Sequence, residues 1–302
     1  MNRTTPETAL TLPQIDAPRR VIGGRTFNFD REVAVMAIVN RTPDSFYDQG
    51  ATFALDASVV AAHRAIADGA DWIDIGGAKF APGPAVPIEQ EIDRVVPVVE
   101  ALRGSGVVIS VDTFHPAVAA ASIAAGAHVI NDTTGVHDPA MADIVADSDA
   151  TLVITHSLAA PRRPHPAPHY DDVVADVREF LLARVDRAMG RGVLRERIII
   201  DPGHDLNKTT RHSLELTRRL GEITGLGLPT LVAVSNKDFV GESLDRPRGE
   251  RVEGSLAAMT VCILQGARIV RMHNVRAAVD AVRMTEAILG FREPAYERHN
   301  LA

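Results

Sequence analysis

Seven polar side chains stand where short apolar runs of this 302-residue chain end. Two are carboxylates, two are amides, two are permanent or near-permanent cations and one is an imidazole; they are Asp112, Asp201, Asn40, Asn131, Lys237, Arg271 and His273. Carboxylates accept hydrogen bonds, amides both donate and accept them, and cations bind anions. The set therefore indicates a site that binds a polar or anionic small molecule.

The elements that must position these side chains are eight runs that are almost continuously apolar. The runs cover residues 33–40, 72–77, 107–113, 128–135, 151–157, 197–203, 230–236 and 267–274. Continuous rather than alternating apolar runs are typical of parallel strands that are buried on both faces. Because helical stretches follow the runs, we predict an α/β fold of the (β/α)8 TIM barrel type, with its chemistry at the C-terminal strand ends.

Six segments between these runs carry apolar residues at helical spacing: 54–70, 88–104, 115–127, 138–148, 170–192 and 251–267. Residues 21–30 are predicted to form a hairpin over the bottom of the barrel, with Gly23 and Gly24 as its turn. We therefore expect a flexible N-terminal tail over 1–20 and one barrel domain over 21–295. Three long loops, 40–56, 76–90 and 157–172, are candidates for lids over the site.

The composition narrows the class of protein. A formal net charge of −7 disfavours nucleic acid as a partner, since binding to phosphate backbones needs a basic face. Since no apolar stretch approaches the length of about 18 residues that a membrane span needs, we expect no membrane association. The single cysteine, Cys262, excludes an internal disulfide and is expected to be a buried small hydrophobic residue. A cytoplasmic enzyme is the simplest interpretation.

Several other residues favour a structural role. Trp72 is expected to pack rather than to stack on a ligand, and His165 and His169 lack the spacing of metal ligands. His156 ends an apolar run and could line the pocket.

Motifs along almost the whole barrel resemble those of the dihydropteroate synthase family of pterin-binding enzymes. In chain order they are MAIVNRTPDSFYDQGA from Met36, DIGGAKFAPG from Asp74, ISVDT, VINDTTG, IIIDPGHDLNK, VSNKDFVGE, ERVEGSLAA and GARIVRMHNV. The resemblance implies a transferase that joins a pterin-methyl diphosphate to p-aminobenzoate and releases diphosphate, a step of folate synthesis. It also implies a homodimer.

The resemblance assigns roles to the polar strand ends. Asp112, Asn131, Asp201 and Lys237 match the residues that bind the pterin. From the residues alone, Asp112 and Asp201 could instead cap the helices that follow them.

Asn40, Arg271 and His273 match the diphosphate site, where the asparagine also helps to hold Mg2+. The family's proposed catalytic residues correspond to Asp44, Lys237 and Arg271, with Asp44 stabilising a pterin-methyl cation that forms after diphosphate leaves. The alternative for Arg271 is a structural bridge between barrel carboxylates.

The chain departs from the family at the mouth of the barrel. Ala78, Lys79, Phe80 and Ala81 replace the usual Glu-Ser-Thr-Arg, which removes an arginine. Arg41 replaces a valine, Asn236 replaces the arginine before the lysine, and residues 204–207 replace an aromatic and glycine pattern. Arg41 and Lys79 could restore positive charge, although arginine and lysine differ in geometry at phosphate sites.

The segments NRTPDSFYD and SNKD resemble those of the second, divergent dihydropteroate synthase paralogue of actinomycetes. Three functions are therefore considered. The first is a dihydropteroate synthase with reduced or altered activity. The second is a non-catalytic or functionally divergent pterin-binding protein. The third, disfavoured by the residues suited to diphosphate, is a pterin-dependent methyltransferase.

Overall fold

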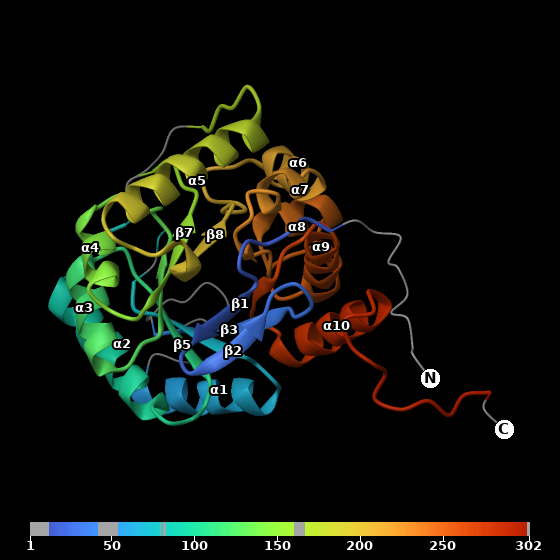
Figure 1. Cartoon of the computed structure of the whole chain (residues 1–302), viewed down its shortest axis with the longest axis horizontal. Helices are drawn as coiled ribbons and strands as arrows, with labels where there is room; N and C mark the ends of the chain where they lie inside the picture. Colours follow the sequence, from blue (N-terminus) through green and yellow to red (C-terminus); the bar gives the residue numbers. More distant parts are fainter. Residues whose placement is uncertain (1–11, 42–53, 79, 81–82, 160–166, 301–302) are drawn as a thin grey trace.

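The computed structural model describes residues 12–41, 54–78, 80, 83–159 and 167–300. Eight parallel strands form a barrel in the order β8-β7-β6-β5-β4-β3-β10-β9 (Figure 1). An isolated bridge between Ile200 of β8 and Thr230, the residue before β9, joins the two ends of this order. The strands are β3 (Ala34–Asn40), β4 (Trp72–Gly76), β5 (Val108–Asp112), β6 (Val129–Asp132), β7 (Thr151–Thr155), β8 (Ile198–Asp201), β9 (Leu231–Val232) and β10 (Ile269–Met272). The predicted (β/α)8 barrel is confirmed.

The helices surround the barrel. Six match the predicted segments: α1 (Leu55–Ala67), α2 (Ile88–Leu102), α3 (Pro116–Ala125), α4 (Ala140–Ala146), α5 (Val173–Gly190) and α9 (Val252–Leu264). The others are α6 (Thr210–Arg218), α7 (Gly221–Thr224), α8 (Asp238–Leu244), α10 (Val275–Ile288) and the 3-10 turn η1 (Arg195–Arg197). No helix in the described ranges is both long enough and apolar enough to cross a membrane.

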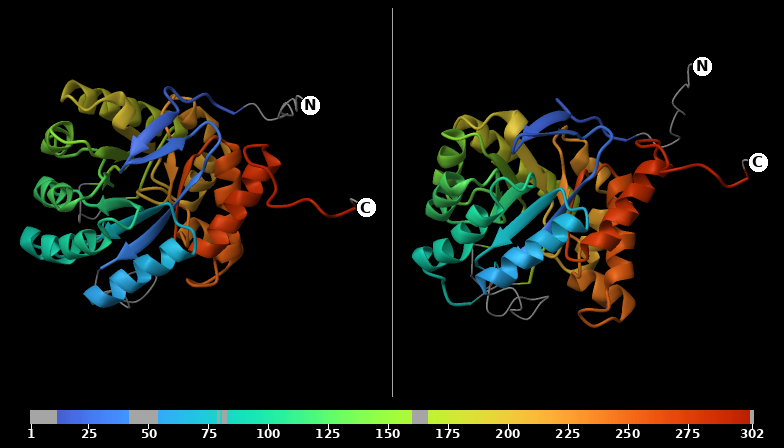
Figure 2. Two further views of the ribbon diagram at one scale, coloured as in Figure 1. Left: turned by 60° about the horizontal axis from the view of Figure 1, so that its bottom comes forward. Right: turned by 90° about the horizontal axis from the view of Figure 1, so that it is seen from below.

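A hairpin of β1 (Arg19–Ile22) and β2 (Arg25–Asn28) crosses the end of the barrel away from the strand tips (Figure 2). Its turn has the expected residues, Gly23 and Gly24, with φ of 57° and 76°, values that glycine adopts without strain. The hairpin begins at Arg19, before the expected boundary. Ile15 is buried and the Asp16 amide donates to the Gly227 carbonyl, so this part of the N-terminal segment packs on the barrel.

The barrel has two apolar layers because successive strand residues face opposite sides. The outward side chains pack against the helices, and Cys262 of α9 is buried there as predicted. The inward layer near the hairpin is apolar and consists of Ile15, Ile22, Phe27, Phe29, Ala34, Met36, Trp72, Val108, Val129, Val153, Ile199, Leu231 and Ile269. Trp72 is fully buried in this layer, as its predicted packing role requires.

The inward positions nearer the strand tips are polar. Two residues after Trp72, Val108 and Ile199 come Asp74, Ser110 and Asp201 respectively. The same step of two leads from Val129 to Asn131 and from Ile269 to Arg271. The alternation of the strands therefore gathers these side chains inside the upper barrel.

Candidate active site

A buried carboxylate at the centre of the barrel connects four strands. Asp74 on β4 has no exposed side-chain surface. It accepts hydrogen bonds from the Ser110 hydroxyl (2.6 Å), the Asn131 amide (3.1 Å) and Nε of Arg271 (2.6 Å). Asp74 lies directly opposite Ser110 in the parallel register of β4 and β5, which explains the first contact. A buried carboxylate needs such partners to remain in a folded protein.

Arg271 on β10 connects Asp74 with the predicted pterin residue Asp112. Its Nη2 lies 3.0 Å from Oδ2 of Asp112, and its side chain is 15% exposed. Burial opposes the charge of the guanidinium, but the neighbouring carboxylates outweigh this effect and raise the pKa of Arg271. Arg271 therefore forms the bridge between barrel carboxylates that was the alternative for this residue, and it does so within the predicted pterin site.

Burial also raises the pKa values of Asp112 and Asp201, the two predicted pterin carboxylates. It raises the pKa of Asp112 to about 7, although the Arg271 cation opposes the shift. It raises the pKa of Asp201 to about 6, and the backbone amide of Gly203 (2.7 Å from Oδ1), Lys237 and Lys208 oppose it. Such shifts are common at functional sites.

Neither carboxylate caps a helix. Asp201 binds the Gly203 amide, whereas α6 is capped by Thr209, whose hydroxyl accepts from the His212 amide. Asp112 binds Arg271, and His115 occupies the N-cap position of α3 without a side-chain cap. The helix-cap alternative for Asp112 and Asp201 is therefore wrong.

Lys237 lies at the N-cap position of α8. Burial lowers the pKa of its ammonium, the carboxylates of Asp205, Asp201 and Asp112 oppose that shift, and the Arg271 cation adds to it. These electrostatic effects require Lys237 to lie near the other predicted pterin residues. The structure thus brings Asp112, Asn131, Asp201 and Lys237 together at one end of the barrel.

Two of the predicted diphosphate residues, Asn40 and Arg271, lie on the adjacent strands β3 and β10. Asn40 ends β3, and its Oδ1 is only 2.9 Å from the position that a Cβ at Gly76 would occupy, so a larger residue at position 76 would displace this amide. His273 follows β10, and its backbone amide and Nδ1 lie 3.1 and 3.0 Å from the Ser235 hydroxyl. Asp44, the predicted cation-stabilising residue, lies outside the described residues.

The changed residues at the mouth are only partly described. Lys79 and Ala81 are outside the described ranges, whereas Ala78 and Phe80 are half-buried. Nη1 of Arg41 donates to the Asp93 and Arg94 carbonyls of α2, both at 2.9 Å. These contacts tie the start of the first loop to α2.

Asn236 is buried and has a φ of 56°, a left-handed value that asparagine tolerates better than most residues. Its amide nitrogen in the backbone donates to the Ser255 hydroxyl (2.9 Å), and its carbonyl accepts from Arg251 (3.1 Å). β9 ends at Val232, before the predicted end of the run at residue 236.

Asparagine and aspartate occupy left-handed positions in the loop after β8. Asn207 has a φ of 50°, and its side-chain oxygen accepts from the Ser157 hydroxyl and the amides of Leu158 and Ala159, each at 2.9 Å. Asp205 has a φ of 63°, and its carboxylate accepts from the Asp238 amide (2.6 Å) at the start of α8. The two residues connect the loops after β7, β8 and β9.

A buried lysine in the same loop, Lys208, contacts a buried histidine that follows β7, His156. Nζ of Lys208 is 2.8 Å from Nδ1 of His156 and donates to the Gly203 carbonyl (2.9 Å). Burial lowers the pKa of Lys208 to about 7 and that of His156 to about 2. His156 is therefore a neutral acceptor in the core rather than a group that lines an open pocket.

The sequence did not single out Asp74, Ser110, Ser235 or Lys208. Asp74 carried a usable signal, since a carboxylate inside an otherwise apolar run must have partners in the barrel. Ser110 and Ser235 carried none, because serine is common in every environment and only the register shows what it contacts.

The oxygen donors of the site fit only one mode of Mg2+ binding, in which the protein supplies few ligands. Within the described ranges, no group of three or more histidine, cysteine, aspartate or glutamate side chains could hold a metal. Mg2+ usually keeps several waters and binds through few protein oxygens together with substrate phosphates. The Asn40 amide oxygen could be such a protein ligand, with waters and the substrate diphosphate supplying the others.

Comparison with known proteins agrees with this geometry. The pterin binding enzyme family matches residues 36–273. "Inactive dihydropteroate synthase 2" of Mycobacterium tuberculosis is 46% identical over 92% of this chain and 90% of its own length. The dihydropteroate synthase of Escherichia coli is 39% identical over 86% of this chain and 93% of its own length.

A solved structure shares the fold. Burkholderia cenocepacia dihydropteroate synthase, complexed with 7,8-dihydropteroate, superposes with a TM-score of 0.82 at 38% identity, over 92% of this chain and 97% of the other. The match to the family runs from the inward layer of β3 to the end of β10 and includes every described polar strand end. The chain belongs to the pterin-binding enzyme family, among proteins of the dihydropteroate synthase type.

Proposed function

We propose that this protein binds 6-hydroxymethyl-dihydropterin diphosphate in the barrel mouth and condenses it with p-aminobenzoate, releasing diphosphate, with reduced or altered activity. The observation that carries the proposal is the convergence of Asp112, Asn131, Asp201 and Lys237 above one buried carboxylate, Asp74. The proposed reaction is a step of folate synthesis.

The pterin end of the proposed site is supported by its hydrogen-bonding capacity. A pterin presents a flat edge with an amino group and ring nitrogens, and an ionised carboxylate can accept two hydrogen bonds from such an edge. Asp201 and Asp112 supply carboxylates, and the Asn131 amide supplies both donor and acceptor. The Asn131 Oδ1 is buried and accepts no hydrogen bond from the part of the chain that the structure describes, which leaves this acceptor for a ligand.

The anion end would stabilise the departing diphosphate. The Arg271 cation and the Asn40 amide lie on adjacent strands, the His273 imidazole directly follows β10, and the three groups would bind phosphate oxygens. Mg2+ held by Asn40 and the diphosphate would supply further neutralisation of the leaving group. We propose that diphosphate leaves before the aniline nitrogen attacks, with Asp44 stabilising the cationic pterin-methyl group.

A second candidate is a pterin-binding protein without synthase activity. It is favoured by the 46% identity to a protein named as inactive and by the changed residues at the mouth, including Ala78 and Asn236. Under this alternative, the pterin end is retained while the p-aminobenzoate end has another use or none.

Two measurements distinguish these candidates. Purified protein is titrated calorimetrically with the pterin diphosphate in the presence of Mg2+, and dihydropteroate is then quantified after p-aminobenzoate is added. Binding with product above the background of an Asp201→Asn control supports the synthase. Binding without product supports the second candidate, and no binding contradicts both.

Diphosphate binding is tested by comparing the pterin diphosphate with the pterin alcohol. We expect diphosphate to increase the affinity, and His273→Ala to remove most of that increase. Equal affinities for the two ligands would contradict the diphosphate role of Asn40, Arg271 and His273.

A further inference from the structure

Lys237, one of the predicted pterin residues, lies in a turn that is held from the neighbouring helix α9. The turn begins at Asn236, whose φ is 56°, and leads into α8 at Asp238. The Asn236 amide donates to the Ser255 hydroxyl (2.9 Å), and that hydroxyl donates to the Arg251 carbonyl (2.6 Å). The start of α9 therefore binds the residue that precedes Lys237.

The guanidinium group of Arg251 holds the other side of this turn. Its Nη1 lies 3.1 Å from the carbonyl oxygens of both Asn236 and Lys237, and 2.9 Å from Oδ1 of Asp238. Its Nε donates to the Arg246 carbonyl (3.0 Å), and only 9% of the Arg251 side chain is exposed. The planar fork of arginine supplies donors in two directions, which a lysine cannot do. These contacts fix three consecutive residues, with Lys237 in the middle.

The sequence of α8 leaves room for this guanidinium group. A Cβ atom at Gly241 would lie 2.2 to 2.3 Å from Cζ, Nε and Nη2 of Arg251, which is too close for any packed atoms. A side chain at position 241 would therefore displace the guanidinium group. Two of the segments that match the family, VSNKDFVGE and ERVEGSLAA, supply the two sides of this contact, Gly241 and Arg251.

The position of the turn determines where the Lys237 ammonium lies. Burial lowers the pKa of this ammonium, and the carboxylates of Asp205, Asp201 and Asp112 oppose the shift, so the group lies among the carboxylates of the site. We propose that Arg251 is a positioning residue for Lys237, which fixes the turn from which the lysine reaches the ligand. The inference rests on the proposed pterin role of Lys237.

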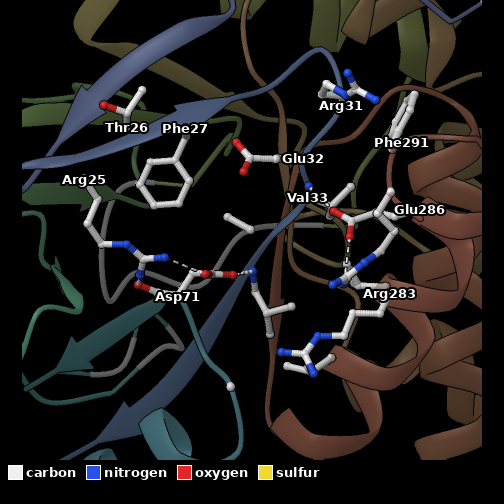
Figure 3. Close-up of a pocket in the computed structure, with 16 residues that line it drawn as sticks. Arg25, Thr26, Phe27, Arg31, Glu32, Val33, Asp71, Arg283, Glu286 and Phe291 are labelled. Atoms are coloured by element: carbon white, nitrogen blue, oxygen red, sulfur yellow. Dashed lines mark hydrogen bonds and ion pairs between the residues drawn. The ribbon is translucent and has the colours of Figure 1, made fainter. Parts of the chain in front are cut away.

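The opposite end of the barrel contains side chains that also hold the main chain but lie far from Lys237. Glu286 lines a cavity at that end and accepts from the Val33 amide (2.8 Å) before β3 (Figure 3). Arg20 is buried and donates to three carbonyl groups, those of Asp16, Ala17 and Arg195. Loss of either contact should lower stability without moving Lys237, so both residues provide controls.

Acetylation with acetic anhydride tests the position of Lys237 without a ligand. The chain has only three lysines, so the peptide of each can be followed by mass spectrometry: Lys79, Lys208 and Lys237. Arg251→Gln and Gly241→Ala should each raise the acetylation rate of Lys237 several-fold, because the turn is no longer held. Lys208, whose Nζ is bound by the loops after β7 and β8, is the internal reference. Unchanged rates at Lys237 in both variants would overturn the proposal.

A double-mutant cycle tests whether Arg251 acts through Lys237. Calorimetry with the pterin diphosphate and Mg2+ measures the affinities of Lys237→Met, Arg251→Gln and the combined variant. Each single change should weaken binding by about tenfold or more, the loss expected for a contact that involves a charged group. The combined variant should bind no more weakly than Lys237→Met, because Arg251 then has no lysine to position. Additive losses would instead show two independent contributions and contradict the proposal.

Gly241→Ala repeats the test with Arg251 still present, and it should lower the affinity as Arg251→Gln does. Its matched control is Gly190→Ala, which adds the same atom in open space at the end of α5 and should bind as the unmodified protein does.

Arg20→Gln and Glu286→Ala should lower the urea midpoint of unfolding but keep both the pterin affinity and the acetylation rate of Lys237. Equal effects of these two variants and Arg251→Gln on Lys237 would assign the result to general stability and overturn the proposal. Failure of the unmodified protein to bind the pterin diphosphate would contradict the proposed function, whereas the acetylation rates would still decide whether Arg251 positions Lys237.

Discussion

At the scale of single residues, the site depends on one carboxylate that does not reach the strand tips. Asp74 is fully buried, and it is bound by three side chains from β5, β6 and β10. Two of these, Asn131 and Arg271, are themselves predicted to contact ligand. Asp74 is therefore a positioning residue for both ends of the proposed site.

We expect Asp74→Asn to destabilise the protein and weaken pterin binding together. The change leaves Asp112 as the remaining carboxylate that contacts Arg271, and breaking a buried ion pair on one side costs about 3–5 kcal/mol. Urea unfolding monitored by the single tryptophan, Trp72, measures the first effect, and calorimetry with the pterin measures the second. The control Ser110→Ala removes one neutral donor and should cost about 1 kcal/mol. Pterin affinity that is unchanged in Asp74→Asn would contradict the positioning role.

The raised pKa of Asp201 predicts a pH dependence of pterin binding. Burial raises this pKa to about 6, so the carboxyl gains a proton as the pH falls through that value and loses acceptor capacity. Affinity should be highest above pH 7 and fall by up to about tenfold per pH unit below pH 6. Asp201→Asn should bind more weakly and show a flatter profile. An unmodified protein with constant affinity from pH 5 to pH 8 would contradict the assignment of Asp201 as acceptor.

At the scale of elements, the loop after β8 connects its neighbours through side chains at left-handed positions. Asn207 accepts three hydrogen bonds from the segment 157–159, and the Tyr170 hydroxyl donates to its carbonyl (2.9 Å). Asp205 holds the start of α8, next to Lys237. Glycine at these positions would adopt the same backbone conformation but could make none of the side-chain bonds. Asp205 and Asn207, two of the residues that differ from the family pattern, therefore restrain the loops at the mouth of the barrel.

We expect Asn207→Gly to loosen the loop after β7 without unfolding the barrel. The change keeps the left-handed backbone favourable but removes the acceptor for the Leu158 and Ala159 amides. Hydrogen exchange should become faster at these two amides while the amides of β5 and β6 stay protected. The control Asp245→Gly, also left-handed but on the exposed end of α8, should not affect them. Unchanged protection at Leu158 and Ala159 would show that Asn207 does not restrain the loop.

At the scale of the whole molecule, the two ends of the barrel have different roles. The N-terminal hairpin closes one end with Phe27 and Phe29, whose rings are stacked at 5.7 Å, and Phe27 also meets Trp72 edge-on. The strand tips at the other end carry the polar side chains. The apolar layer below them provides a rigid floor for the site and excludes water from beneath Asp74.

We expect Phe27→Ala to destabilise the whole barrel. Removal of a buried phenylalanine typically costs about 3–5 kcal/mol, because apolar contacts are lost and a cavity remains. Urea unfolding should shift to lower concentration, and Trp72 emission should move to longer wavelength if water enters the cavity. Val21→Ala, on the exposed face of the same hairpin (73% exposed), should have an effect below about 0.5 kcal/mol. Equal stability of the two variants would contradict the role of the hairpin as a plug.

The sequence by itself predicted the barrel, its hairpin and the strand tips that carry the polar side chains. These features depend on local information: continuous apolar runs mark parallel strands, and Gly23-Gly24 marks a tight turn. Helices α6, α8 and α10 were not named in advance. In α6 and α8 the segments are short, at 9 and 7 residues, so each spans too few turns to show a clear helical period.

Only the tertiary structure decided how the polar residues are connected. Asp74 and Arg271 are 197 positions apart, and they meet because the closed barrel places β4, β5 and β10 around one interior. The structure also rejected the helix-cap interpretation of Asp112 and Asp201, showed Arg271 as a bridge, and showed that Asn207 and Asp205 join neighbouring loops. Residue types and spacing determine which groups face the barrel interior, since alternation along a strand is local. Which of those groups touch depends on strand order, register and closure, and these are properties of the folded chain.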